Sequence, residues 1–273
     1  MPMDSKSFDR LIQLPEPVSE MFEAWDKEMP SRVDPDLEAR LLCRETWTDA
    51  EKELEARLEE DPAHLRLLWE ELRIACRRYP RWEAAGIPLE IYRDTMMFAT
   101  RYLNDALRDW GDWRFTAGWW FPRQLAMELF RLGSLEFELA ALPEGRKVSL
   151  HIPSDASLAP EAIDDSLARF RDFAARFYPD WENVDLYCDS WLISPVLRDL
   201  LPATSRILAF QDRFEVLSVD TESLGAVNWV FPGPRKDFAL LPENTGLQRK
   251  MKAFLLAGGK PGWAEGRLKS FTP

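Results

Sequence analysis

The sequence has few of the residues that build metal sites and disulfide frameworks. It holds only two histidines and three cysteines in 273 residues. Cys43, Cys76 and Cys188 are odd in number and widely spaced, which favours reduced thiols over paired ones. Because no cluster of His and Cys has metal-ligand spacing, no metal site is expected. Reduced thiols are typical of the cytoplasm, which is therefore the expected location.

Long apolar runs are also missing. No run approaches the roughly 18 consecutive apolar residues that a membrane-spanning helix needs, so no span is expected. The N-terminal stretch "MPMDSKSFDR" lacks the basic start and apolar centre of a secretory signal. The sequence therefore predicts neither a membrane-spanning helix nor a secretory signal.

Positive charge is in short supply, since the formal net charge is −12. Nucleic-acid binding needs a basic face that neutralises phosphates, so a nucleic-acid partner is not expected, nor is an anionic membrane surface. A phosphorylated cofactor is still possible because it needs only a local cluster of cations. Hydrophobic residues make up 46% and charged residues 30%, as in an ordinary globular protein of one large or two small domains.

The residues that are present divide the chain into two regions. The segment 1–110 carries apolar residues at the helical period of about 3.6, and it predicts an all-helical N-terminal domain. One helix is expected to begin at Asp61-Pro62 and another to span 88–108. The rest, 111–273, mixes strand and helix patterns and predicts a second domain.

This second region has turn signals between short alternating segments. The expected order is a hairpin of strands over 135–139 and 147–152, a helix from Pro160, a strand over 183–188, short strands near 206–210, 214–219 and 227–231, a helix over 245–257 and a last strand near 266–271. Helices followed by mixed strands and helices predict an α/β (α+β) fold with a mixed sheet flanked by helices.

The hairpin contains His151, one of the two histidines. Its two strands should turn their apolar residues to one face, and the length of the "ALPEGR" connection then places Glu136 opposite His151. Directly opposed side chains lie about 4.5–5.5 Å apart at Cβ, so this carboxylate could orient the imidazole as a base. A register shifted by two would instead place Glu138 or Ser134 there. The alternative interpretation is a polar cross-strand pair on a solvated face.

Signals for phosphate binding are weak. No P-loop and no G-x-G-x-x-G motif occurs. Thr245 and Gln248 form a T-x-x-Q capping box, so Gln248 either serves the helix end or, with the neighbouring Arg249, meets a pyrophosphate. The glycine-rich stretch "AGGKPGWAEG" carries Lys260, but it follows a helix where a phosphate loop would precede one.

Several blocks together resemble a known family. The chain is similar to two-domain bacterial acyltransferases, which join a helical N-terminal acyltransferase domain to a GNAT-like C-terminal domain. The similarity runs in order through most of the chain after residue 80, in the blocks "GIPLEIYRDT" (86–95), "FRLGSLEFEL" (130–139), "VSLHIPSDASL" (148–158), "CDSWLISPVLRDLLP" (188–202), "SRILAFQDRFEV" (205–216) and "LPENTGLQRKMKAFLLAGG" (241–259).

The resemblance implies a GNAT-like sheet and direct transfer of an acyl group from acyl-CoA or acetyl-CoA to a small-molecule amine. On that chemistry, His151 supported by Glu136 is the expected general base. Tyr187 or Ser190 is a candidate acid for the departing thiolate. Cys188 is either an inert buried thiol or a lesser candidate for a covalent acyl carrier. The competing class is a non-catalytic ligand-binding or regulatory protein with the same fold.

The donor is expected to contact the end of the hairpin and the C-terminal helix. In the GNAT superfamily a splayed pair of strands receives the thioester, and backbone N–H groups polarise its carbonyl. We assign this contact to Ile152 and Pro153, and the phosphates to Gln248, Arg249 and Lys260.

One departure from the superfamily stands out. The pyrophosphate loop (Q/R)-x-x-G-x-(G/A) is absent, and the corresponding stretch "PSDASLAP" has no glycine and carries Asp155. Either CoA is held elsewhere, or the donor differs, or the domain has lost its activity.

Overall fold

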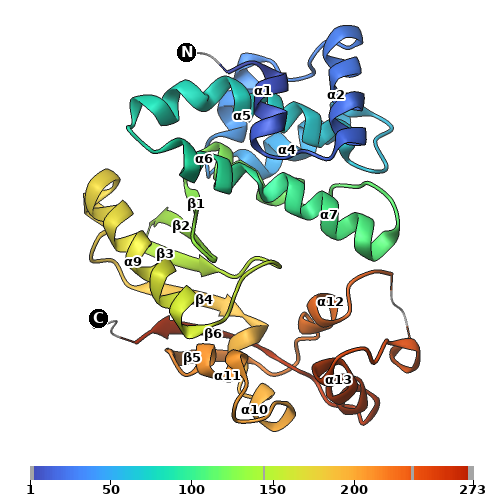
Figure 1. The fold of residues 1–273 in the computed structure, drawn as a ribbon, viewed down its shortest axis with the longest axis vertical. Coiled ribbons are helices and arrows are strands. Elements are labelled where there is room, and N and C mark those ends of the chain that lie inside the picture. The colour runs from blue at the N-terminus through green and yellow to red at the C-terminus, as the bar shows by residue number, and fades with distance from the viewer. Residues whose placement is uncertain (1–2, 144, 235–236, 270–273) are drawn as a thin grey trace. The chain divides into compact units, whose positions relative to one another are not determined.

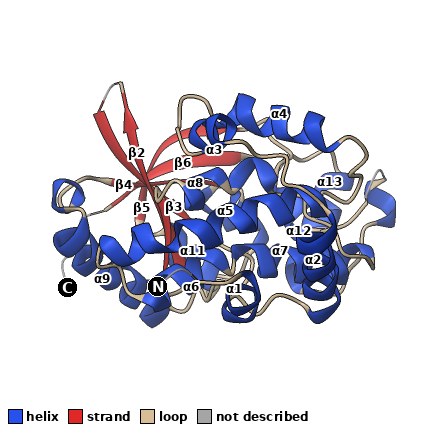
Figure 2. Ribbon diagram, turned by 90° about the horizontal axis from the view of Figure 1, so that it is seen from above, coloured by secondary structure: helices blue, strands red, loops and turns tan. Residues whose placement is uncertain are grey.

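The computed structural model describes residues 3–143, 145–234 and 237–269, and it divides into two compact units, Met1–Leu132 and Gly133–Pro273 (Figure 1). The expected domain boundary at 110 coincides with the end of a helix, Phe98–Trp110. The first unit continues beyond it through two short helices and one strand. Among the residues described, the strands, red in Figure 2, all lie from Leu129 onward along the chain.

The first unit is helical, as the sequence predicts. Its elements are α1 (Ser5–Leu11), α2 (Glu16–Glu28), α3 (Pro35–Leu41), α4 (Trp47–Leu58), α5 (Leu65–Ala84), α6 (Leu89–Met96), α7 (Phe98–Trp110), the 3₁₀ helix η1 (Gly118–Trp120), α8 (Pro122–Leu125) and β1 (Leu129–Leu132).

Local chemistry sets several of these helix ends. Asp61 precedes α5, and its carboxylate accepts hydrogen bonds from the N–H groups of Leu65 and Leu67, so the helix starts later than Asp61-Pro62. The single helix expected over 88–108 is two helices, α6 and α7, which meet at Met97. Gly111 ends α7 in the left-handed conformation, with φ of 81°, which glycine adopts without strain.

Buried aromatic rings and one buried ion pair hold the first unit together. Trp82 and Tyr92 lie 5.2 Å apart between ring centroids, and the Tyr92 hydroxyl donates to the Ala75 carbonyl of α5. Arg73 of α5 makes two hydrogen bonds to Asp9 of α1, at 2.9 and 3.3 Å, and one to Asp26 of α2 at 2.8 Å. The Arg73 guanidinium therefore links three helices, α1, α2 and α5.

The second unit contains β2 to β6 and is built around a mixed sheet. Its elements are β2 (Leu135–Leu142), β3 (Gly145–His151), α9 (Pro160–Phe177), η2 (Pro179–Trp181), β4 (Leu186–Ser190), η3 (Trp191–Ile193), α10 (Leu197–Leu200), α11 (Arg206–Gln211), β5 (Phe214–Asp220), α12 (Ala226–Val230), η4 (Phe238–Leu240), α13 (Gly246–Leu256) and β6 (Trp263–Leu268).

Within the second unit the strand order is β2-β3-β4-β6-β5, so β5 is an edge strand. β3 and β4 run parallel, while β2 with β3, β4 with β6, and β5 with β6 run antiparallel. The predicted mixed sheet flanked by helices is confirmed. One extra residue, Leu217, forms a bulge in β5 between Val216 and Ser218.

Helix α9 covers the apolar face of this sheet (Figure 1). The Phe137 ring of β2 stacks on the Phe170 ring of α9, with centroids 4.5 Å apart. Val148 and Leu150 of β3 point to the same face and are buried. The alternation seen in the sequence therefore describes the hairpin correctly, since its odd β2 and even β3 positions fill one core.

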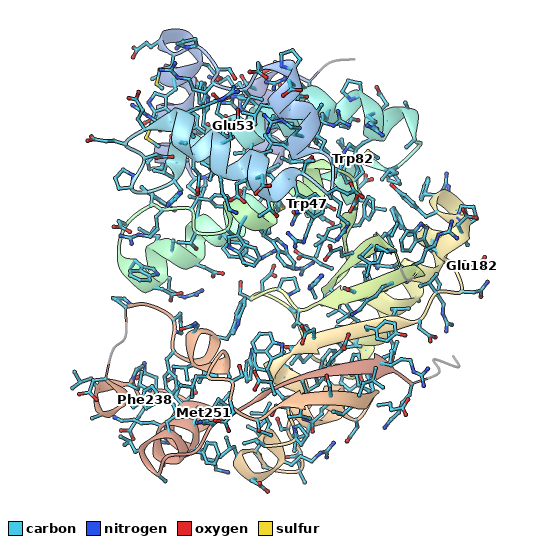
Figure 3. All side chains as sticks on the ribbon, turned by 180° about the vertical axis from the view of Figure 1, so that it is seen from behind. Trp47, Glu53, Trp82, Glu182, Phe238 and Met251 are labelled. Atoms are coloured by element: carbon cyan, nitrogen blue, oxygen red, sulfur yellow. The ribbon has the colours of Figure 1, made fainter. Side chains whose placement is uncertain are left out.

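Two segments that the sequence predicts as strands are helices. Residues 206–210 lie in α11, whose N-cap is the Ser205 side chain, and 227–231 overlap α12. Leu208 and Val230 both contribute to a small apolar cluster with Met251 of α13, against which Phe238 packs (Figure 3). Short apolar runs do not distinguish a strand from a buried helical turn, so tertiary packing decided these elements. The last strand, β6, begins earlier than the expected 266.

No helix within the described ranges is long and apolar enough to cross a membrane.

Candidate active site

The register of the strands brings one row of polar residues across the sheet. Glu138 of β2 lies opposite Ser149 of β3, and Ser149 lies opposite Tyr187 of β4. Tyr187 lies opposite Arg267 of β6, which lies opposite Glu215 of β5. Because paired residues share a face, this row lies on the side of the sheet away from α9.

His151 lies on the same face, two residues beyond Ser149. The predicted register is confirmed, because Glu136 is the residue directly opposite His151. The recorded hydrogen bond, however, joins His151 Nε2 to Glu138 Oε2 at 3.0 Å. Diagonal neighbours on adjacent strands remain within reach of long side chains, and this diagonal contact is what the sequence argument for Glu136 missed.

The His151–Glu138 pair is half-closed to solvent. The Glu138 side chain is 8% exposed and the His151 side chain is 25% exposed. A buried carboxylate that accepts from one ring nitrogen holds the imidazole in a fixed orientation and tautomer. The His151 side chain is thus partly open to solvent, whereas Glu138 is nearly closed off. This is the geometry expected of a general base.

The two parallel strands part just beside this pair. β3 and β4 pair only at Val148 with Leu186 and at Ser149 with Tyr187. Beyond this point β3 continues to His151 without β4, while β4 continues to Ser190 with only its other edge paired, to β6. The backbone at the end of β3 therefore loses its β4 partner, and unpaired backbone donors at such a point can bind a ligand oxygen.

Two of the predicted candidates lie on the opposite face from His151. Cys188 and Ser190 are one and three residues from Tyr187, and the pleat turns both toward the apolar side. Cys188 is fully buried, and burial raises the pKa of its thiol far above the usual range. The proposed covalent carrier is therefore an inert core thiol. The Ser190 oxygen caps η3 by accepting from Leu192 N–H at 3.2 Å, so this predicted acid has a structural task.

Tyr187, the other predicted acid, shares the face of His151. Lys147 lies over its ring, with the ammonium 5.1 Å from the centroid, and also pairs with Glu265 at 2.5 Å. Further along this face, Trp263 donates to Asp189 at 2.6 Å. Sequence reasoning did not single out Lys147, Asp189 or Trp263. Strand alternation alone would have assigned Lys147 to this face.

The two residues predicted to contact the thioester differ in what they can offer. Ile152 follows the last residue of β3 and has a backbone N–H. Pro153 has none, so it cannot polarise a carbonyl, and its own carbonyl accepts from Ala156 N–H at 3.0 Å. The loop then leads into α9, whose first turn carries Glu161. Together with the exposed Asp155, this loop has the wrong charge for a pyrophosphate.

The residues predicted to hold phosphates are engaged elsewhere. Gln248 completes the capping box of α13 through its oxygen, and its amide nitrogen donates to the Val230 carbonyl at 3.0 Å. Arg249 donates to the Glu243 carbonyl at 2.9 Å, and Lys260 pairs with Glu222. Gln248 is thus a structural residue. Arg249 and Lys260 are exposed enough to exchange partners.

A cavity of about 350 Å³ lies in the first unit and contains none of the predicted site residues. Its carboxylates are already used, since Asp26 accepts from Trp69 and Arg73 while Glu70 accepts from Ser31. Across the residues described, no group of three or more His, Cys, Asp or Glu side chains could hold a metal ion.

Comparison with known proteins supports an assignment of the fold and of the enzyme class. Residues 129–268 match the family model of the GNAT-like C-terminal domain, and residues 3–127 match that of the N-acyltransferase N-terminal domain. The two models meet close to the boundary between the compact units. The two matched domains together define an acyltransferase of the GNAT type.

The chain belongs to the family of acyltransferases that combine these two domains. A search of curated proteins finds no match. Among solved structures, the chain is similar to an acyltransferase in complex with decanoyl-CoA and teicoplanin, with 23% identity, a TM-score of 0.67 and coverage of 98% of this chain and 99% of that one. It is also similar to an acyltransferase in complex with CoA and 10C-teicoplanin, with 22% identity and the same TM-score and coverage. At this identity the likeness shows a common fold.

Proposed function

We propose that this acyltransferase transfers an acyl group from acyl-CoA directly to the nitrogen of a small-molecule amine. The observation that carries the proposal is the His151–Glu138 pair beside the point where β3 and β4 part. Aminolysis of a thioester in one direct step requires three parts: a base, a gap between parallel strands that admits the thioester, and a backbone N–H donor at the end of a strand.

The proposed step is a single displacement through a tetrahedral intermediate. The amine nitrogen attacks the thioester carbonyl, and His151 removes the proton as the C–N bond forms. Glu138 holds the proton on Nε2, which directs Nδ1 to the base role. The N–H of Ile152 donates to the carbonyl oxygen as it gains charge. The C–S bond then breaks, and the CoA thiolate takes a proton from Tyr187 or from solvent.

The donor and acceptor classes rest on chemistry and on the similar structures. Those structures hold decanoyl-CoA or CoA and a teicoplanin, which supports a fatty acyl-CoA donor and a small-molecule acceptor here. Acetyl-CoA is the shorter donor to be compared. Arg249 and Lys260 are proposed to exchange their present partners for CoA phosphates. All three cysteines are free thiols, which supports a cytoplasmic location, and the resemblance supports a bacterial source.

The second candidate function is non-catalytic binding on the same fold. The loop between β3 and α9 favours it, because Asp155 and Glu161 occupy the place where GNAT proteins bind pyrophosphate. A protein of this kind would bind an acyl group or amine without releasing CoA.

A thermal-shift series with CoA, acetyl-CoA, octanoyl-CoA and decanoyl-CoA tests the proposal. A ligand present at 100 times its dissociation constant should stabilise the protein by about 2.7 kcal/mol. Thiol release in the presence of an amine then separates the two functions. Stabilisation together with amine-dependent thiol release supports the transferase, and stabilisation alone supports the binding protein. If none of the acyl-CoA thioesters stabilises the protein, an acyl-CoA donor is refuted.

The two glutamates of β2 provide a matched pair for the mechanism. Glu138→Gln is expected to lower kcat about tenfold or more, because the amide can no longer accept and orient the Nε2 proton in the same way. Glu136 lies on the same strand and face and is also buried. The kcat of Glu136→Gln should stay close to that of wild type. The acidic limb of the pH–kcat profile should change only in Glu138→Gln. Equal losses in both variants would assign no positioning role to Glu138.

A further inference from the structure

Helix α5 carries a carboxylic acid that the proposed mechanism does not use. Glu71 is fully buried, and across the described residues neither of its side-chain oxygens has a hydrogen-bond partner. A buried charge without a partner is among the most costly features a folded protein can contain. We therefore expect Glu71 to be the neutral acid in the folded protein. Loss of its proton would leave a buried charge without a partner, which strongly destabilises this packing.

Two glutamates of α4 face Glu71. Glu51 is 6% exposed, and Glu55, one turn later, reaches the surface and pairs with His64 at 3.4 Å. Repulsion from Glu51 and Glu55 adds to burial in raising the pKa of Glu71 well above its ordinary value. We call Glu51, Glu55 and Glu71 the carboxyl seam. It runs from solvent at Glu55 to the interior at Glu71.

The surroundings of Glu51 are apolar and tightly packed. Gly118 of η1 lies so close that a Cβ there would be 2.5 Å from Leu67 Cδ2 and 3.1 Å from Glu51 Oε1. Arg123 of α8 is a cation that acts on Glu51, and its guanidinium is stacked 4.2 Å from the Trp120 ring centroid. Lys52 is on the outer side of α4.

Burial dominates the protonation of Glu51. It raises the pKa to about 7, with a further rise from Glu55, and the opposing effects of Arg123 and Lys52 are smaller. The carboxyl groups of the seam are thus Glu51, Glu55 and Glu71. The cations that act on Glu51 are Arg123 and Lys52, and His64 pairs with Glu55.

We propose that the carboxyl seam is a pH-controlled latch of the helical unit: protonated Glu51 and Glu71 keep α4 closed on α5 and η1, and loss of their protons releases it. The direction follows from linkage. Both groups bind a proton in the closed state and release it, with the ordinary pKa of 4.5, once exposed to water.

The pH window follows from the same shifts. Stabilisation by the Glu51 proton is complete below pH 4.5 and is lost as the pH rises to about 7, while that by Glu71 is lost over a range that extends higher. Carboxylates with lowered pKa, such as Asp34 and Glu53, act in the opposite direction, but only below their ordinary values. Above pH 5, of the groups named here, only those of the carboxyl seam make the stability of the helical unit depend on pH.

Hydrogen–deuterium exchange of the full chain between pH 5.5 and 8 tests the latch. After correction for intrinsic exchange, protection of peptides from α4 and the first half of α5 should fall about tenfold per pH unit for each proton released. Peptides from α9 and β2 in the second unit should keep their protection. The measurement needs no substrate, so it is independent of the proposed function.

Glu51→Gln and Glu71→Gln should each make this pH dependence shallower by the contribution of one proton, because a neutral amide has no proton to release. Glu53→Gln is the control on the same helix (Figure 3), since Glu53 is an exposed partner of Arg40 and Arg57 and its removal should preserve the slope. If Glu71→Gln does not fold, Glu51→Gln alone decides the question. Wild-type protection that does not change with pH, or a slope in Glu51→Gln that is as steep as that of wild type below pH 7, overturns the proposal.

Discussion

Replacing His151 by alanine is expected to lower kcat for acyl transfer by about 100- to 10,000-fold, the usual contribution of a general base. The effect should be large because His151 is the imidazole that lies beside the parted ends of β3 and β4 and is oriented by Glu138. KM for acyl-CoA should change little, since the imidazole acts on the amine. Thiol release at saturating acyl-CoA, followed over pH, measures the loss.

The chain supplies a matched control for this variant. Its other histidine, His64, is half exposed before α5 and pairs with Glu55, so His64→Ala should retain wild-type kcat. An alanine at 151 that leaves turnover unchanged, in a protein that still shows the acyl-CoA thermal shift, would remove the base from the mechanism while leaving the donor in place.

Replacing Arg73 by alanine is expected to lower the free energy of unfolding of the helical unit by about 3–5 kcal/mol. Arg73 is 8% exposed and is the cation shared by Asp9 and Asp26. Asp9 is only 1% exposed, so removal of the guanidinium leaves a buried carboxylate without its counter-charge. Urea denaturation followed by tryptophan fluorescence measures the effect, with circular dichroism separating the helical unit from the sheet.

Arg77, one turn further along α5, is the appropriate comparison. Its side chain is 48% exposed and pairs with Glu38 at 2.7 Å, so Arg77→Ala should cost about 1 kcal/mol or less. Similar losses in the two variants would show that the network around Arg73 is worth no more than a surface pair.

The hairpin was the most predictable part of the site. Its two strands alternate cleanly and the connection between them is short, so the pleat and the turn fix the register together. The sequence alone therefore predicts Glu136 opposite His151, as the structure shows. The register does not determine which rotamers meet, and the bond to Glu138 depends on how two long side chains lean along their strands.

The candidates on β4 show a second limit. Tyr187, Cys188 and Ser190 are neighbours in sequence, and each has a side chain capable of proton or acyl transfer. A strand turns alternate residues to opposite faces, so only Tyr187 shares the side of His151. Strand alternation makes this distinction only once the pairing of β4 with β3 is known, and the paired residues are 38 positions apart in the chain.

The phosphate-binding assignments were the least predictable. A capping box and a donor to pyrophosphate both require a glutamine beside a helix start, and the sequence does not separate them. The structure assigns Gln248 to the cap and to the Val230 carbonyl. Similarly, residues 206–210 and 227–231 have strand-like composition, but their apolar side chains are needed by a cluster of short helices.

The bulge at Leu217 has a consequence for the behaviour of the protein at high concentration. An open sheet edge is a template on which another extended chain can polymerise, and β5 exposes Val216, Leu217 and Val219 there. The extra residue breaks the regular spacing of the backbone groups, and Glu215 and Asp220 add like charges near both ends. The backbone N–H and C=O groups of β5 are therefore not spaced to pair with a regular incoming strand. This mismatch protects the apolar edge from ordered aggregation.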